Sequence, residues 1–190
     1  MTSQPPFSAN TYPLPFPCET AISIADNSWQ AHAAALAARS DAILAVTLHH
    51  LLPQLPLQDA DTPVPIEVSF LFTDDTEIQA LNKNFRGKDT ATNVLSFPDT
   101  DLTIANLQMA ARFEEPLLLG DIAFAEQTIE REASEQNKSF NDHLAHLTVH
   151  GVLHLLGYDH METPDALKME ATEIEILAKL GIDNPYMDNK

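Results

Sequence analysis

The sequence predicts an α+β domain in which a small mixed sheet of about four strands is packed by about five helices. The segment 66–72 (IEVSFLF) alternates apolar and polar residues, as a half-buried strand does. Segments with helical periodicity alternate with further strand-like segments, in the order β-α-β-α-β-β-α-α-α. Residues 143–160 (HLAHLTVHGVLHLLGYDH) hold five of the eight histidines in a leucine-rich helix, which predicts a metal site at the C-terminal end of a late helix.

The chain divides into an arm and one domain. A length of 190 residues with 44% hydrophobic content suits a single domain with a substantial core. Residues 1–20 are interrupted by prolines, so we expect a flexible N-terminal arm there and a single domain over residues 21–190. The prolines of the arm are Pro5, Pro6, Pro13, Pro15 and Pro17.

Capping and breaking residues delimit the elements of the first half. Asn27 or Ser28 can cap a helix that Pro53 stops, and Asp74 or Asp75 can cap a helix that Gly87 ends. The predicted elements are a strand at 21–25, a helix from about 28 to 52, a strand at 66–72, a helix from about 75 to 86 and a strand at 92–97.

The second half contains the histidine-rich helix. Acidic residues are spread through 99–115, which predicts a loop without metal ligands. Ser139 or Asn141 can cap the histidine-rich helix, and Gly157 permits the positive φ that ends it. The remaining predicted elements are a strand at 116–125, a helix at 125–134 and a last helix from Thr163-Pro164 to Gly181.

Helical spacing selects the candidate metal ligands. His150 and His154 are four residues apart and therefore project from nearly the same face of a helix. His146 lies four residues before His150, so that pair is equally good geometrically. Only the last turn of the helix lies near the residues that follow Gly157. The bend therefore favours the pair His150 and His154 over the pair His146 and His150, and His160 can return as a third ligand. Three imidazoles with a free coordination position are typical of a catalytic metal site, and His146 then has a packing or supporting role.

These residues carry a family resemblance. The segment 150–160 (HGVLHLLGYDH) resembles the signature of the YbeY family of bacterial metallo-endoribonucleases. The segments 82–98 (NKNFRGKDTATNVLSFP) and 119–122 (LGDI) resemble two other blocks of that family, and the three blocks stand in the family's order over roughly residues 65–186. The resemblance implies the same α+β architecture. Phe85 stands where many relatives carry Tyr, and Ala91 where many carry Pro.

Three further residues are candidates for roles near the metal. Arg86 matches a family position linked to activity, and a guanidinium can grip phosphate oxygens and offset charge that builds on phosphorus. Asp159, beside His160, is a candidate proton acceptor, although it can equally cap the bend. Asp121 can accept a hydrogen bond from a ligand histidine and set its tautomer, although a structural role is equally plausible.

Charge and cysteine content limit the partners and the location. The formal net charge is −18, which is the wrong sign for a general nucleic-acid binder. Lys83, Arg86 and Lys88 form a local basic patch, so RNA binding requires this patch, the metal's charge and a partner such as the ribosome or a basic assembly factor. One cysteine, Cys18, no secretory signal and no long apolar run predict a cytoplasmic protein without membrane contact.

The resemblance implies a zinc-dependent, single-strand-specific endoribonuclease that acts in 16S rRNA 3′-end maturation and ribosome quality control. One zinc ion on three neutral imidazoles can activate a water molecule to attack a phosphodiester, although other divalent metals also accept this ligand set. RNA is the expected partner, together with the ribosome or ribosomal proteins, and DNA is not expected. Two alternatives are a metallohydrolase of another class, such as a peptidase, and a non-catalytic ribosome-assembly factor with a structural metal. Gly151 argues against a peptidase, because HExxH proteases place Glu there as general base.

Overall fold

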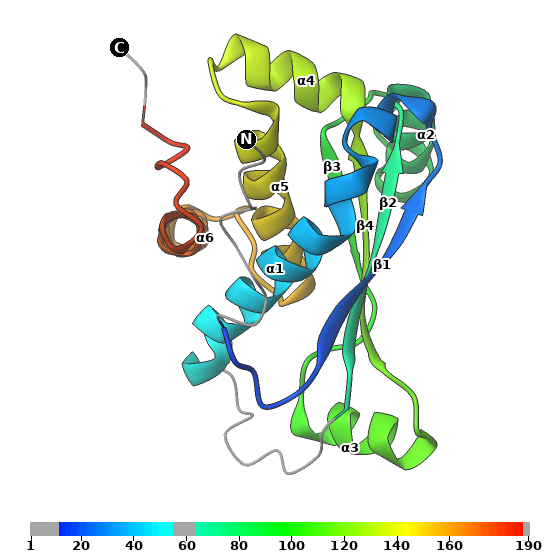
Figure 1. Ribbon diagram of the computed structural model, residues 1–190, viewed down its shortest axis with the longest axis vertical. Coiled ribbons are helices and arrows are strands. Elements are labelled where there is room, and N and C mark those ends of the chain that lie inside the picture. Colours follow the sequence, from blue (N-terminus) through cyan, green and yellow to red (C-terminus); the bar gives the residue numbers. More distant parts are fainter. Residues whose placement is uncertain (1–11, 55–63, 188–190) are drawn as a thin grey trace.

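A computed structural model describes residues 12–54 and 64–187. Four strands form one mixed sheet in the order β1-β2-β4-β3, in which β1, β2 and β4 are parallel and β3 pairs antiparallel with β4 at the edge (Figure 1). This confirms the predicted small mixed sheet. The strands are β1 (Cys18–Ile24), β2 (Ile66–Thr73), β3 (Val94–Pro98) and β4 (Leu117–Ala125).

The two faces of the sheet differ in how they are covered. In β2 the side chains of Val68, Phe70 and Phe72 are buried on the face toward the helices, whereas Ser69 and Leu71 point to the other face and are only partly buried. This is the alternation that the sequence predicted. The face that carries the larger core is called the inner face below, and the opposite one the outer face.

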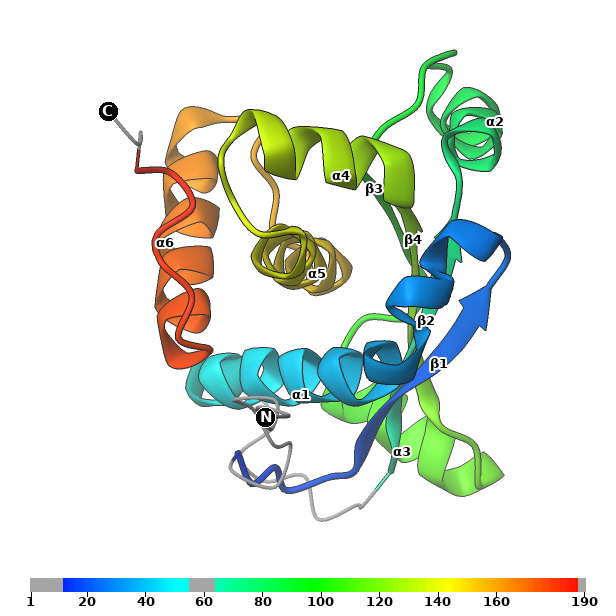
Figure 2. The ribbon, with the colours of Figure 1, turned by 45° about the horizontal axis from the view of Figure 1, so that its top comes forward.

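Six α-helices occur in the described residues, close to the predicted number. Figure 2 shows α5 at the centre of the inner-face layer, with α1, α4 and α6 around it, while α2 lies beyond the sheet next to β3 and β4. No helix in the described part of the chain is both long and apolar enough to cross a membrane. The helices are α1 (Ala33–Leu51), α2 (Asp75–Arg86), α3 (Ile104–Phe113), α4 (Glu126–Glu135), α5 (Phe140–Leu155) and α6 (Thr163–Lys179).

The prediction of a loop over 99–115 was wrong, because this segment contains α3. Thr103 caps the helix by accepting a hydrogen bond from the backbone N–H of Asn106, and Glu114 ends it in the left-handed conformation with φ 56°. Leu107 is its only buried residue. Ile104, Ala110 and Ala111 pack beside Leu107 against the core, so α3 has a short apolar stripe, but its acidic flanks favour a loop when only the sequence is considered.

The N-terminal boundary also differs from the prediction. The first strand begins at Cys18 and not at residue 21, so residues 18–20 of the predicted arm belong to the sheet, while residues 1–11 lie outside the described residues. The helix expected from about residue 28 is split into a 3-10 turn, η2 (Asn27–Ala31), and α1. Trp29 explains the split, because its buried indole donates a hydrogen bond to the carbonyl of Thr73 (2.8 Å) and holds η2 against β2.

The central helix α5 lies unusually close to the sheet. Ser139 caps it by accepting from the N–H of Asp142 (3.0 Å), and its end is followed by Gly157 with φ 84°. A Cβ on Gly151 would lie 2.9 Å from Ile122 Cδ1 and 3.2 Å from Ser96 Oγ. Glycine at 151 thus lets α5 pack directly against β3 and β4, and a larger residue there would require Ile122 to shift.

Candidate metal centre

Three histidines converge where α5 ends. His150 and His154 lie one turn apart with ring centroids 4.6 Å from each other. The chain bends after Gly157, and the ring of His160 returns to 5.5 Å from His150 and 5.1 Å from His154. One nitrogen of each ring lies within 4.8 Å of the others, so the structure brings the three predicted ligands together.

The hydrogen-bond partners of two rings assign their tautomers. His150 Nδ1 donates to the carboxylate of Glu173 (2.7 Å), and His154 Nδ1 donates to the backbone carbonyl of Tyr158 (3.0 Å). Both partners can only accept, so both Nδ1 atoms carry protons. When both rings are neutral, the two Nε2 atoms turn lone pairs toward each other at 3.1 Å. A cation between them would relieve this repulsion.

The protonation state also suits metal binding. The pKa of His154 is lowered to about 4. Burial is the largest cause, and the charge of the neighbouring His150 is the next. The ring is therefore neutral at pH 7, which is the form that binds metals. The Nε2 atoms of His150 and His154 and the third ring at the bend fit the ligand set of a divalent cation, and a set of three protein ligands is typical of catalytic sites that also bind water.

Glu173 of α6 is the central support of this cluster. Its side chain is only 1% exposed, and one oxygen accepts from His150 while the other accepts from His146 Nε2 (3.0 Å) and the hydroxyl of Tyr186. Burial alone would raise the pKa of this carboxyl, but the hydrogen bonds from the two histidines and the tyrosine outweigh it and lower that pKa to about 2. His146 therefore supports the carboxylate and lies outside the converging set.

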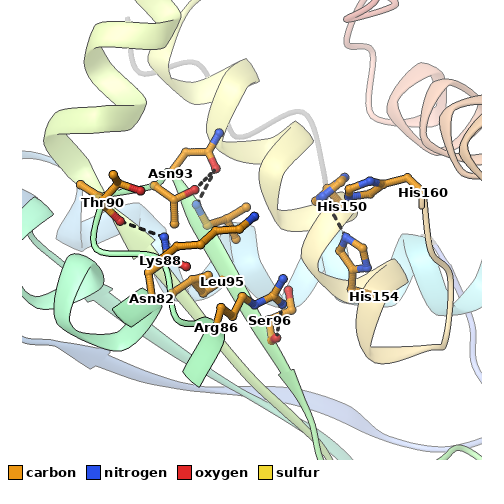
Figure 3. Close-up of a pocket in the computed structure, with 13 residues that line it drawn as sticks. Asn82, Arg86, Lys88, Thr90, Asn93, Leu95, Ser96, His150, His154 and His160 are labelled. Atoms are coloured by element: carbon orange, nitrogen blue, oxygen red, sulfur yellow. Dashed lines mark hydrogen bonds between the residues drawn. The ribbon is translucent and has the colours of Figure 1, made fainter. Parts of the chain in front are cut away.

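The histidines open into a polar cavity of about 370 Å³. Figure 3 shows the three histidines on one side of it and Arg86 and Lys88 on the other. Arg86 is the last residue of α2, and its Nη2 donates to the carbonyl of Ser96 on β3 (3.1 Å), its only hydrogen bond within the described residues. A cation-binding cluster facing a guanidinium is an arrangement that suits a phosphate ester.

Comparison with known proteins identifies the family. Residues 26–181 match the sequence model of the family described as Endoribonuclease YbeY. The chain belongs to the YbeY family. The Endoribonuclease YbeY of Magnetococcus marinus is 53% identical over 124 residues, which cover 65% of this chain and 84% of the relative. That of Rhodopseudomonas palustris is 44% identical over 172 residues, covering 90% and 94%.

A solved structure supports the fold. The solution structure of the Thermotoga maritima protein TM1509 superposes with a TM-score of 0.52 at 22% identity, covering 85% of this chain and 88% of that one. At this identity the likeness concerns the α+β architecture alone. The fold expected from the resemblance to the YbeY family is thereby confirmed.

The two candidate aspartates, Asp159 and Asp121, have different positions in the structure. Asp159 Oδ1 accepts from the backbone N–H groups of His160 (2.7 Å) and Met161 (3.3 Å), which holds the bend in shape, and its role as a proton acceptor stays a prediction. Asp121 lies exposed on the outer face of the sheet, so the interpretation of Asp121 as a histidine acceptor was wrong. Glu173 takes that position.

Sequence reasoning missed Glu173 because α6 is acidic along its length. Within six positions α6 carries three glutamates, Glu170, Glu173 and Glu175. Their spacing does not indicate which of them faces α5. The signal that could have found it is the helical phase: Glu173 lies four residues after Met169 and three before Ile176, both of which are buried. A carboxylate on an apolar stripe requires buried partners.

Replacing Glu173 with glutamine is expected to weaken metal binding about 10- to 100-fold, because the carboxylate that orients a ligand histidine contributes that much. The measurement is competition for Zn²⁺ against a chromophoric chelator. The matched control is Glu175→Gln, the same change on the exposed side of α6, where the side chain is 67% exposed. Equal zinc affinities for the two variants would contradict the supporting role.

Proposed function

We propose that this chain is a metal-dependent endoribonuclease that cuts single-stranded RNA during ribosomal RNA maturation. The observation that carries the proposal is the single cavity in which the three converging histidines face Arg86 and Lys88. The relatives named Endoribonuclease YbeY support the same reaction. Maturation of the 16S rRNA 3′ end and ribosome quality control belong to the proposal as its cellular setting.

His150, His154 and His160 would hold one zinc ion, although three imidazoles also accept cobalt, nickel or copper. When bound, the ion would lower the pKa of water and so supply a nucleophile at neutral pH. The residues of the chain do the positioning. Glu173 and the carbonyl of Tyr158 fix the two ligand rings, and Arg86, anchored to Ser96, would bind the phosphodiester and offset its growing charge.

The charge distribution favours a local contact with RNA. The net charge of −18 would repel a polyanion at long range. In the basic patch, Lys83 is paired with Asp89 (2.7 Å), which leaves Arg86 and Lys88 to line the cavity. RNA would therefore have to be presented by a positively charged partner. We propose that this partner is the ribosome or ribosomal proteins in the cytoplasm, with no role for DNA.

Two observations argue against the alternatives. A glutamate at position 151, which the HExxH peptidase chemistry requires, would overlap Ile122 on the packed side of α5. A purely structural metal usually has four protein ligands, whereas the cluster has three among the described residues and opens into the cavity. Both features favour a hydrolase acting on a phosphodiester.

The test uses the full chain loaded with zinc, stripped by chelation and reloaded. Single-stranded RNA, double-stranded RNA and an unstructured peptide are offered as substrates in parallel. We expect cleavage of the single-stranded RNA alone, lost on chelation and restored by metal. Peptide cleavage, or RNA cleavage that survives complete metal removal, would overturn the proposal.

A further inference from the structure

The outer face of the sheet carries a second cavity that the proposed reaction does not use. It has a volume of about 320 Å³ and lies between α2 and the strands β2, β3 and β4. Its walls are apolar apart from one carboxylate. They include Leu71, Leu81, Phe85, Phe97, Ala123 and Asp121.

The two cavities share a wall. Phe85 precedes Arg86 at the end of α2, and Phe97 follows Ser96 on β3. The Arg86–Ser96 hydrogen bond joins these two segments on the side of the histidines, while the two phenylalanines touch on the other side. Because β3 is the edge strand, an RNA strand bound at both cavities would have to pass around this edge.

Phe85 has the features of a stacking platform. Its side chain is 68% exposed although it belongs to a well-formed helix. Its ring meets Phe97 edge to face, with centroids 5.2 Å apart and planes at 67°. That contact fixes the ring and leaves its own surface open to solvent. An aromatic ring held rigid beside a phosphate-binding site is how proteins stack unpaired bases.

We propose that this outer groove binds one unstacked nucleobase of the same RNA strand whose phosphodiester lies at the histidines. The inference rests on the proposed function and adds a subsite to it. The base would stack on Phe85 above the apolar floor formed by Leu71 and Ala123. Asp121, which is exposed at the rim, would accept hydrogen bonds from the base edge. Guanine offers two adjacent N–H donors, whereas uracil offers one, so the groove prefers guanine.

Charge and size favour a base over a protein segment. Arg86 follows Phe85 in sequence and its side chain is bonded to Ser96, the neighbour of Phe97, so it would hold a phosphate that flanks the base. A stable protein interface buries roughly 800 Å² on each partner, whereas this groove exposes one large apolar side chain and has room for about one base. A protein partner is therefore the competing outcome of the test.

The test compares Phe85→Ala with Phe113→Ala in the zinc-loaded full chain. Phe113 is the matched control, since it is 62% exposed at the end of α3, on the far end of the sheet from α2 (Figure 1). The probes are short single-stranded RNAs with 2-aminopurine at successive positions. We expect Phe85→Ala to raise KM about tenfold or more with kcat within about twofold, because a stacked base contributes that much binding. We also expect it to abolish the fluorescence quenching at one position, while Phe113→Ala changes neither.

Two further variants separate stacking from apolar packing. Phe85→Trp is expected to keep the low KM, whereas Phe85→Leu, which remains apolar, behaves like Phe85→Ala. Asp121→Asn is expected to reduce the preference for guanine over uracil at the quenched position. An unchanged KM in Phe85→Ala, or full rescue of KM by Phe85→Leu, would overturn the inference in favour of a protein partner for the groove. RNA cleavage by the wild type would in that case still support the proposed function. If the wild type neither cleaves nor binds the RNA, both proposals fall.

Discussion

Replacing His154 with alanine is expected to remove the bound metal and to slow RNA cleavage at least about a thousandfold. The change leaves two candidate ligands, and Nε2 of His150 loses the partner that faces it at 3.1 Å. Activation of water by a cation contributes several kcal/mol to a hydrolytic step, which corresponds to this loss of rate. The metal content of the purified protein, measured by mass spectrometry, and the cleavage rate are followed together.

His146→Ala is the matched control for this prediction. It removes an imidazole from the same helix, two turns before His154 and one turn before His150, but that ring contacts Glu173 and not the converging nitrogens. We expect the control to keep its metal, and we expect His150→Ala and His160→Ala to behave like His154→Ala. Full metal occupancy in any of these three variants would rule that residue out as a ligand.

Replacing Arg86 with alanine is expected to lower kcat about 100- to 1000-fold while the metal content stays complete. A positioned donor that stabilises charge building in the transition state contributes this much when it is lost. Arg86 is not one of the converging ligands, and its side chain is anchored by a single hydrogen bond to Ser96, so the histidine cluster is expected to survive the change. Single-turnover cleavage of a short RNA measures the chemical step.

Two variants sharpen the interpretation of Arg86. Arg86→Lys keeps the charge but not the planar fork, so we expect only partial recovery of kcat. Arg112→Ala removes an exposed arginine from α3 and is expected to change nothing. If Arg86→Ala retained the wild-type rate, the phosphate would have to be bound elsewhere in the cavity, and Lys88 would be the next candidate.

The most accurate parts of the sequence prediction depended on local spacing. His150 and His154 face the same way because four residues make about one helical turn, and the glycine after α5 brings His160 back within a few residues. The alternation of apolar and polar residues over 66–72 likewise predicted β2 and the face of this strand that is buried. Arg86 could be placed near the site only through the resemblance, because no local rule relates the end of α2 to α5.

The errors share a different cause. The helix α3 has a capping Thr103 and a short apolar stripe, but it buries only Leu107, and the acidic residues spread through the segment favoured a loop. Asp121 was interpreted as an acceptor for a ligand histidine, but it lies on the outer face of the sheet. The small residues Gly120, Ala123 and Ala125 fit either face of a sheet. The sequence around Asp121 therefore does not show which residues of β4 face the core.

The sequence by itself determined the histidine cluster, the central helix and the half-buried strand, because each depends on residues within a turn or two of one another. Only the tertiary structure decided that Glu173 of α6 orients His150, that Gly151 lets α5 approach β3, and that Phe85 and Phe97 meet across the sheet edge. These contacts join segments that are distant in sequence. The packing of the whole core selects them, since a spacing rule describes one helix or strand but not which of its faces meets another element.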